Sequence, residues 1–171
     1  METSEMEVKC AERYLKTAGL SEQDIDRLQD IGYFGAPASS RHHLAFEGGL
    51  AVHSMNVVDL LLEFRAFNDP RSCYMVGMLH DLVKCQCYEK LDGIWKYKAP
   101  AFPGHGSASA LIAAELGIEL DPVERAAIIW HMGSFDVQAG DRDAYNAALK
   151  KFPRELVLTH AADHLASLME S

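Results

Sequence analysis

The sequence lacks a hydrophobic segment long enough to cross a bilayer, which takes about 20 apolar residues. Its apolar runs are short, as in residues 126–130. It also lacks the basic start and apolar stretch of a secretory signal peptide, because its first residues, Met-Glu-Thr-Ser-Glu, are acidic and polar. These absences predict a protein with no membrane partner, and we expect it in the cytoplasm.

Positive charge is also scarce. The chain has 16 lysines and arginines against 25 aspartates and glutamates, which gives a formal net charge of −9. A surface with this balance repels phosphate polymers as a whole. The charge therefore argues against a long nucleic acid as partner, unless a local positive feature such as bound metal ions attracts it.

Paired CxxC motifs are absent, although the chain has four cysteines: Cys10, Cys73, Cys85 and Cys87. The spacing of Cys85 and Cys87 is too weak a signal for a zinc site, so we expect reduced thiols. The composition, 49% hydrophobic and 24% charged over 171 residues, is that of an ordinary soluble chain. It predicts a single domain over residues 1–171.

Apolar residues recur at helical spacing along most of the chain, and capping boxes, prolines and glycines mark the ends of these segments. The pattern predicts helices over about 4–18, 21–31, 49–67, 71–83, 106–117, 121–131, 141–150 and 153–169. Asp92-Gly93 lies between apolar residues and predicts a turn, so we expect a small β-hairpin near residues 88–97. The predicted fold class is all-α with this one hairpin.

Histidines and carboxylates recur at intervals of 24 to 32 residues, about the length of one helix and its connection. In an antiparallel bundle, this spacing returns each helix to the same level, so that one ligand from each helix can reach a central point. The residues in this pattern are His53, His80, Asp81, His105, His131 and Asp163.

Mixed imidazole and carboxylate ligands suit transition-metal ions such as Mn, Fe, Co, Ni or Zn. Six ligands are more than one catalytic ion with an open position needs. The economical interpretation is two divalent ions bridged by Asp81. Such a pair makes hydroxide available at neutral pH and stabilises charge on phosphoryl oxygens, which is the chemistry of phosphoester hydrolysis.

The order of these residues and their flanking sequences resemble the HD-domain superfamily of metal-dependent phosphohydrolases, in its two-metal form. The matching segments are Gly48–Ser54, Leu79–Lys84, Pro103–Gly106, Trp130–Gly133 and His160–Asp163. The resemblance covers about residues 34–168 and implies an HD-type helical bundle. It also implies an enzyme, either a phosphomonoesterase or a phosphodiesterase.

The resemblance implies specific roles for these residues. His53, His80, Asp81 and Asp163 would hold the first ion, and Asp81, His105 and His131 the second. Asp81 and Lys84 are the expected catalytic residues. Lys84 matches the family's His-Asp-x-x-Lys pattern; we expect it on the helix of His80, where it could neutralise a phosphate oxygen as a point charge.

Other residues are candidates for substrate binding. Arg41, His42 and His43 precede the first ligand and could contact phosphate or a base. Trp130, next to His131, could form a stacking wall with Phe135. His160 precedes Asp163 by three residues, so we expect it to support the site from the same helix face.

Residues 36–40, followed by His42-His43, resemble the HD domain of bacterial 3′–5′ exoribonucleases, and the same segment occurs in small stand-alone HD hydrolases. Because the net charge is negative, we expect a small phosphorylated substrate, a nucleotide or related molecule, with a short nucleic acid less favoured.

Two further functions share the same ligands. Some HD-fold proteins are mixed-valent di-iron oxygenases, and ligand identity alone does not separate them from hydrolases. A binding or signalling module could hold the metals or a nucleotide without turnover. Lys84 and the Gly-His-Gly and Trp-His-Met-Gly segments favour hydrolysis.

Overall fold

The helices begin where local capping groups satisfy the first backbone N–H groups. In the computed structural model, which describes residues 4–171, Ser4, Ser21 and Asp121 each form a capping box with an acidic residue three positions later. Three helices begin with a proline, at Pro70, Pro122 and Pro153, where the missing N–H group costs nothing. The helix that begins at Pro122 is the one that Asp121 caps.

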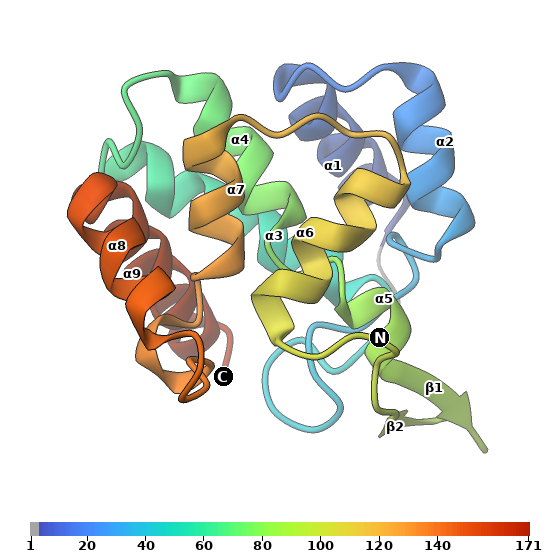
Figure 1. Cartoon of the computed structure of the whole chain (residues 1–171). Coiled ribbons are helices and arrows are strands. Elements are labelled where there is room, and N and C mark those ends of the chain that lie inside the picture. Colours follow the sequence, from blue (N-terminus) through green and yellow to red (C-terminus); the bar gives the residue numbers. More distant parts are fainter. Residues whose placement is uncertain (1–3) are drawn as a thin grey trace.

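The chain is mostly helical, with one two-stranded antiparallel sheet in the described part, so the predicted all-α class with a hairpin is confirmed (Figure 1). The helices are α1 (Glu5–Thr17), α2 (Glu22–Asp30), α3 (Gly49–Glu63), α4 (Pro70–Leu79), α5 (Lys84–Cys87), α6 (His105–Glu115), α7 (Pro122–Ile129), α8 (Arg142–Lys151) and α9 (Pro153–Met169). A short 3-10 helix, η1 (Gly133–Phe135), follows α7. The strands are β1 (Tyr88–Leu91) and β2 (Ile94–Tyr97).

The hairpin forms where Asp92-Gly93 predicts it. Both turn residues have positive φ, 52° at Asp92 and 77° at Gly93, as a two-residue hairpin turn of the favoured hand requires. Tyr88 pairs with Tyr97 and Leu91 with Ile94. The hairpin projects from the helices at the end of α5 (Figure 1).

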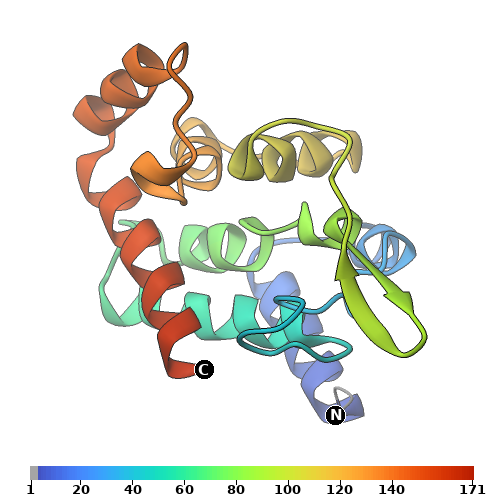
Figure 2. The same cartoon turned by 90° about the horizontal axis from the view of Figure 1, so that it is seen from below.

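Helix α3 lies at the centre of the fold, because apolar side chains cover more than one of its faces. Ten of its 15 residues are buried, and it packs against α1, α4 and α9. Helix α6 packs against α7, and α4 contacts both of them (Figure 2). The elements that carry the predicted ligands are therefore neighbours in space.

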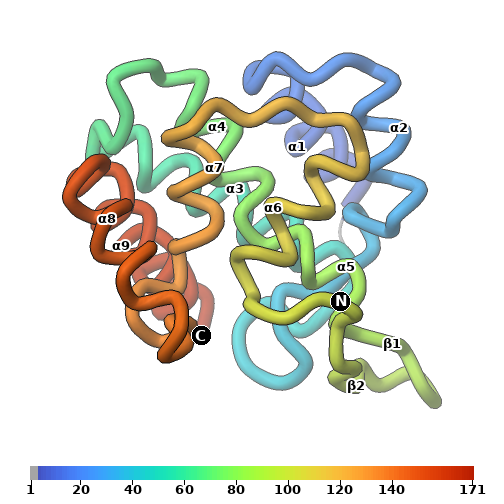
Figure 3. The backbone as a smooth tube through the Cα atoms, viewed as in Figure 1, coloured from blue at the N-terminus to red at the C-terminus, as the bar shows by residue number. Residues whose placement is uncertain are grey.

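The loop that joins α2 to α3 runs along one end of the molecule, close to the end of α9 (Figure 3). Its backbone is held by hydrogen bonds from Ala38 N to Leu44 O and from Leu50 N to Ala36 O, at 3.2 and 3.0 Å. The first bond closes a turn within the loop, and the second joins Ala36 to the start of α3. The loop is thus attached to the helix that carries His53.

Two helices end a full turn or more before the residue that the sequence predicts. Helix α3 stops at Glu63 rather than near residue 67, because Arg65 takes a left-handed conformation, φ 51°, at a position usually filled by glycine. Helix α4 stops at Leu79 rather than near residue 83. Beyond it, the Val83 N–H donates to Ser109 Oγ on α6, at 3.2 Å, in place of a bond within the helix.

Among residues 4–171, no helix combines the length and apolar character of a membrane span. Residues 1–3, which form most of the acidic start of the sequence, lie outside the described part. The assignment of the whole chain to one domain stays a prediction.

Candidate metal centre

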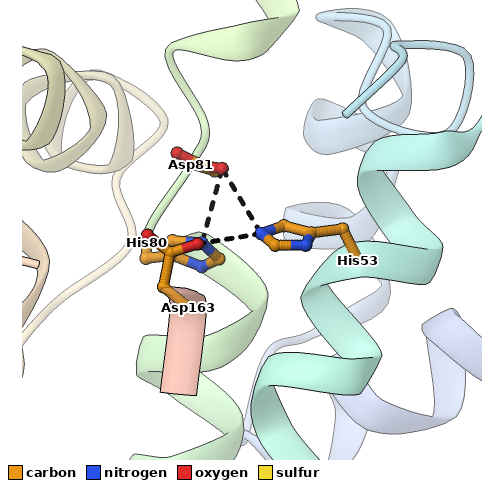
Figure 4. Close-up of side chains that lie close together, drawn as sticks. All are labelled: His53, His80, Asp81 and Asp163. Atoms are coloured by element: carbon orange, nitrogen blue, oxygen red, sulfur yellow. Dashed lines mark hydrogen bonds and ion pairs between the residues drawn. The ribbon is translucent and has the colours of Figure 1, made fainter. Parts of the chain in front are cut away.

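Four of the predicted ligands meet in the interior, from three separate parts of the chain (Figure 4). His53 comes from α3, His80 and Asp81 from the end of α4, and Asp163 from α9. His53 Nε2 lies 3.1 Å from Asp163 Oδ1 and 3.7 Å from Asp81 Oδ2. His80 Nε2 lies 3.4 Å from Asp81 Oδ2 and 3.6 Å from Asp163 Oδ1.

A second group contains Asp81, His105 and His131. His105 is the first residue of α6, and His131 follows the end of α7. Their Nε2 atoms lie 2.5 and 3.5 Å from Asp81 Oδ1. The other oxygen of Asp81 faces His53 and His80. Each carboxylate oxygen therefore faces a different group of potential ligands, as a bridging carboxylate requires.

Backbone hydrogen bonds fix the orientation of two of the buried histidines. His80 Nδ1–H donates to Gly77 O at 2.9 Å, and His131 Nδ1–H donates to Ile128 O at 2.8 Å. In the neutral imidazole this leaves Nε2 with a lone pair. Neither Nε2 atom has a hydrogen-bond partner, although both are buried beside carboxylates. A metal ion would satisfy such atoms, so these residues fit the group that the sequence predicts.

Both carboxylates of the site, Asp81 and Asp163, are ionised. Burial acts to raise the pKa of Asp81, but Lys84, His80 and His105 outweigh it and hold that pKa well below its usual range. Burial likewise acts to raise the pKa of Asp163, and His53 and His80 lower it well below the usual range. Two ionised carboxylates inside the protein need nearby positive charge, from metal ions or from protonated imidazoles.

The imidazole of His80 shows how strong this demand is. Burial lowers its pKa, but the nearby negative charges of Asp81 and Asp163 outweigh burial and raise it to about 10. Without a metal ion, a proton on this ring would balance the carboxylates. A divalent cation would replace that proton and use the same nitrogen as a ligand.

Two glycines allow the helices that carry the ligands to approach closely. A Cβ atom on Gly77 of α4 would lie 2.9 Å from Val58 N on α3. A Cβ atom on Gly106 of α6 would collide with the carbonyl oxygens of Ile128 and Ile129 on α7. The first contact brings His53 and His80 together, and the second does so for His105 and His131.

Lys84 contacts the site, although not from the helix that the sequence predicts. The chain turns after α4, and Lys84 begins α5 instead of extending the helix of His80. Its Nζ atom lies 2.5 Å from Asp81 Oδ2. Burial lowers the pKa of Lys84, but Asp81 outweighs burial and raises it, so the side chain carries a positive charge.

A pocket of about 230 Å³ opens above the ligands. It is lined by His43, Asp81, Lys84, His105, Met132, Phe135, His160, Asp163, His164 and Ser167. His160 Nδ1–H also donates to His131 O at 2.8 Å, so it supports the backbone of a ligand as well as the pocket wall. Phe135 is 83% exposed at the pocket rim.

The four candidate substrate-binding residues lie in different surroundings. His43 lines the pocket, and Ser39 holds its loop by accepting from His42 N and donating to His43 O, at 2.9 and 2.8 Å. Arg41 and His42 have exposed side chains and do not line the pocket. The Trp130 ring lies 5.4 Å from the Tyr145 ring of α8 rather than at the pocket wall.

Two carboxylates that no sequence pattern indicates, Asp136 and Glu170, contact the ligands although they are distant from them in the sequence. Asp136 Oδ2 accepts a hydrogen bond of 2.6 Å from the backbone N–H of His105 and so supports the start of α6. Glu170 accepts from His53 Nδ1–H. Each is separated by 31 residues or more from the histidine it contacts, and no local pattern indicates such a pair.

Comparison with known proteins agrees with this geometry. A family model described as "HD domain" matches residues 50–168. This range contains every residue of the two candidate ligand groups that share Asp81. No curated protein and no solved structure matches the chain.

Proposed function

The chain belongs to the HD-domain family, and from this premise we propose that it is a metal-dependent phosphohydrolase that cleaves a phosphoester of a nucleotide or a related small molecule. The observation that carries the proposal is the placement of Asp81. Its two oxygens face separate groups of histidines, and its partner Lys84 lines the pocket above them.

The residues divide into two ligand sets. His53, His80, Asp81 and Asp163 would hold one divalent ion, and Asp81, His105 and His131 a second one, of Mn, Fe, Co, Ni or Zn. Bound ions of this kind supply a water with a lowered pKa and stabilise negative charge on phosphoryl oxygens. His53, His80 and His131 are buried, so the protein excludes bulk water from this side of the site.

Lys84 supplies a positive charge that does not depend on the ions. Its side chain is 11% exposed, lines the pocket and carries an ammonium group held beside Asp81. A fixed cation in a partly dehydrated pocket stabilises charge that develops on a phosphate oxygen. We therefore assign Lys84 the binding of a non-bridging phosphate oxygen.

A small substrate is favoured over a polymer. The pocket has a volume of about 230 Å³, and the net charge of the chain is −9. A long nucleic acid gains most of its affinity from many phosphate contacts with basic residues, which this charge disfavours. Exposed Phe135 at the rim offers a surface on which a nucleobase can stack, which supports a nucleotide as substrate.

Within the family, we group the chain with small hydrolases that are similar to the HD domain of bacterial 3′–5′ exoribonucleases. Residues 36–43 carry this resemblance. The position of His43 supports this grouping, because the loop of residues 36–43 holds the His43 side chain at the pocket. The loop would therefore contribute to substrate selection.

The proposal is tested by phosphate release from nucleoside monophosphates, cyclic nucleotides, dinucleotides and simple phosphoesters. The metal-free protein is loaded separately with Mn, Fe, Co, Ni or Zn, and Asp81→Ala serves as the inactive control. We expect turnover of at least one nucleotide with at least one metal, and loss of that turnover in the variant.

The absence of turnover across this panel, from a protein that binds two ions, would contradict the proposal. A mixed-valent iron signal in that protein would instead support the oxygenase alternative. Tight nucleotide binding without turnover would support a signalling module.

A further inference from the structure

His53 is contacted by carboxylates on both ring nitrogens. Its Nε2 atom lies 3.1 Å from Asp163 Oδ1 inside the site. Its Nδ1 atom lies 2.9 Å from Glu170 Oε2 and 3.2 Å from Oε1, on the side away from the site. The ring itself has no exposed surface. Because a carboxylate only accepts, the Nδ1–H group donates to Glu170. A metal ion bound at Nε2 would take the place of a hydrogen between that atom and Asp163.

Glu170 is held in place on its other side. Asn56 Nδ2 donates to Glu170 Oε1 at 2.7 Å, and the Glu170 side chain is only 5% exposed. Asn56 lies three residues after His53 on α3, so one helix supplies both the histidine and the group that orients its partner. Glu170 caps α9, the helix of Asp163. The contact therefore also joins the end of α9 to the centre of α3.

This arrangement differs from that of the other buried ligands. His80 and His131 donate their Nδ1–H groups to the backbone carbonyls of Gly77 and Ile128. A carboxylate partner makes an imidazole more basic, and so a stronger metal ligand, than a neutral carbonyl does. Among these three histidines, His53 has the charged partner.

We propose that Glu170 is a positioning residue that fixes the His53 ring and strengthens the binding of the metal ion held by His53, His80, Asp81 and Asp163. The inference rests on the metal sites of the proposed function and does not depend on hydrolysis. A second ion held by Asp81, His105 and His131 should not depend on Glu170, because Glu170 contacts none of these residues through a described hydrogen bond or ion pair.

The test is metal affinity measured by competition with a chelator, using Co²⁺ and Mn²⁺ in the absence of substrate. Glu170→Gln keeps the size of the side chain and a hydrogen-bond acceptor but removes the charge, whereas Glu170→Ala removes both. Loss of such a partner weakens metal binding by about 10- to 100-fold. We expect this loss for one ion in Glu170→Ala, a smaller loss in Glu170→Gln, and unchanged affinity for the second ion.

The matched control is Glu63→Gln, which removes a charge from an exposed side chain that lines the same pocket as Glu170 and Asn56. It should leave both affinities unchanged. The visible absorption spectrum of bound Co²⁺ reports the coordination directly, and we expect it to change in the Glu170 variants only. Circular dichroism confirms that each variant is folded.

Wild-type metal affinity and an unchanged Co²⁺ spectrum in folded Glu170→Gln and Glu170→Ala would overturn the inference. The inference would also be overturned if Glu170 itself were a ligand of a separate ion. His43, His53 and Glu170 also have ligand atoms within 4.8 Å of one another. If they held an ion of their own, His43→Ala would remove that ion as completely as Glu170→Ala does. A protein that fails to hydrolyse any substrate would still test this inference, because metal affinity is measured without substrate.

Discussion

Among single residues, Asp81 makes the most contacts with the candidate ligands, because each of its oxygens has a cationic or cation-binding partner. Lys84, His53 and His80 lie near Oδ2, whereas His105 and His131 lie near Oδ1. The side chain is 2% exposed, so these partners replace solvent almost completely. A buried carboxylate is stable only when such groups compensate its charge.

Lys84→Met is the direct test of the lysine, because methionine keeps most of the buried volume while it removes the charge. Metal content should stay the same, since Lys84 offers no ligand atom to either group. Loss of one electrostatic contact to the reacting group costs about 10²- to 10³-fold in kcat. Metal analysis together with steady-state kinetics on the substrate found in the phosphate-release panel measures both effects.

Lys90→Met is the matched control for this variant. Lys90 lies on the exposed hairpin, 3.0 Å from Glu47 and away from the pocket lining, so its loss should leave kcat unchanged. An unaltered rate in Lys84→Met would show that the lysine only balances the charge of Asp81.

The residue types and order of the candidate ligands could be predicted, because each lies in a distinctive short segment of the sequence. Their supporting partners could not be. Asp136 contacts His105 across 31 residues, and Glu170 contacts His53 across 117. Such contacts depend on how helices pack, and a carboxylate on its own is most often a solvated surface group.

At the scale of elements, close helix packing brings the ligands together. Gly77 permits α4 to lie against the backbone of α3 at Val58, and Gly106 permits α6 to lie against the end of α7. Each contact joins two elements that carry or adjoin a pair of candidate ligands. The helix pairs therefore act as rigid supports for the two groups.

Gly77→Ala tests this support. The added methyl group would meet Val58 Cγ2 at 2.5 Å and Val58 N at 2.9 Å, so α3 and α4 must move apart. Overpacking of this kind costs about 1–3 kcal/mol of stability. We expect a lower melting temperature and weaker binding of the ion held by His53 and His80. Thermal unfolding and chelator competition measure these two quantities.

Gly140→Ala serves as the control, since no atom lies within 4 Å of the Cβ position there. It should change neither quantity. A Gly77→Ala protein with wild-type stability and metal affinity would show that the helix contact is more tolerant than its geometry suggests.

Helix starts could be predicted more reliably than helix ends. Ser4, Ser21 and Asp121 cap through neighbours three residues away, so the sequence contains the whole signal. The ends of α3 and α4 depend instead on a left-handed arginine and on a hydrogen bond from Val83 to Ser109. The error placed Lys84 on the wrong helix, yet its contact with the site survives because the turn after His80 is tight.

At the scale of the whole molecule, the helical arrangement converts a linear series of ligands into one cluster. Ligands spread over residues 53–163 meet because α3, α4 and α9 pack together and α6 and α7 pack alongside α4. Hydrophobic periodicity and the ligand spacing predict this much. They do not predict the shape of the pocket, because Phe135, His160 and His164 reach it only through tertiary packing.

The central claim is that two metal sites share Asp81, and the number of metal ions per chain tests it most directly. Metal-free protein is equilibrated with excess Mn²⁺ or Co²⁺, freed of unbound metal and analysed by mass spectrometry for metal content. We predict two ions in the wild-type chain, one in His131→Ala and none retained in Asp81→Ala. A folded Asp81→Ala protein that still holds two ions would contradict the account.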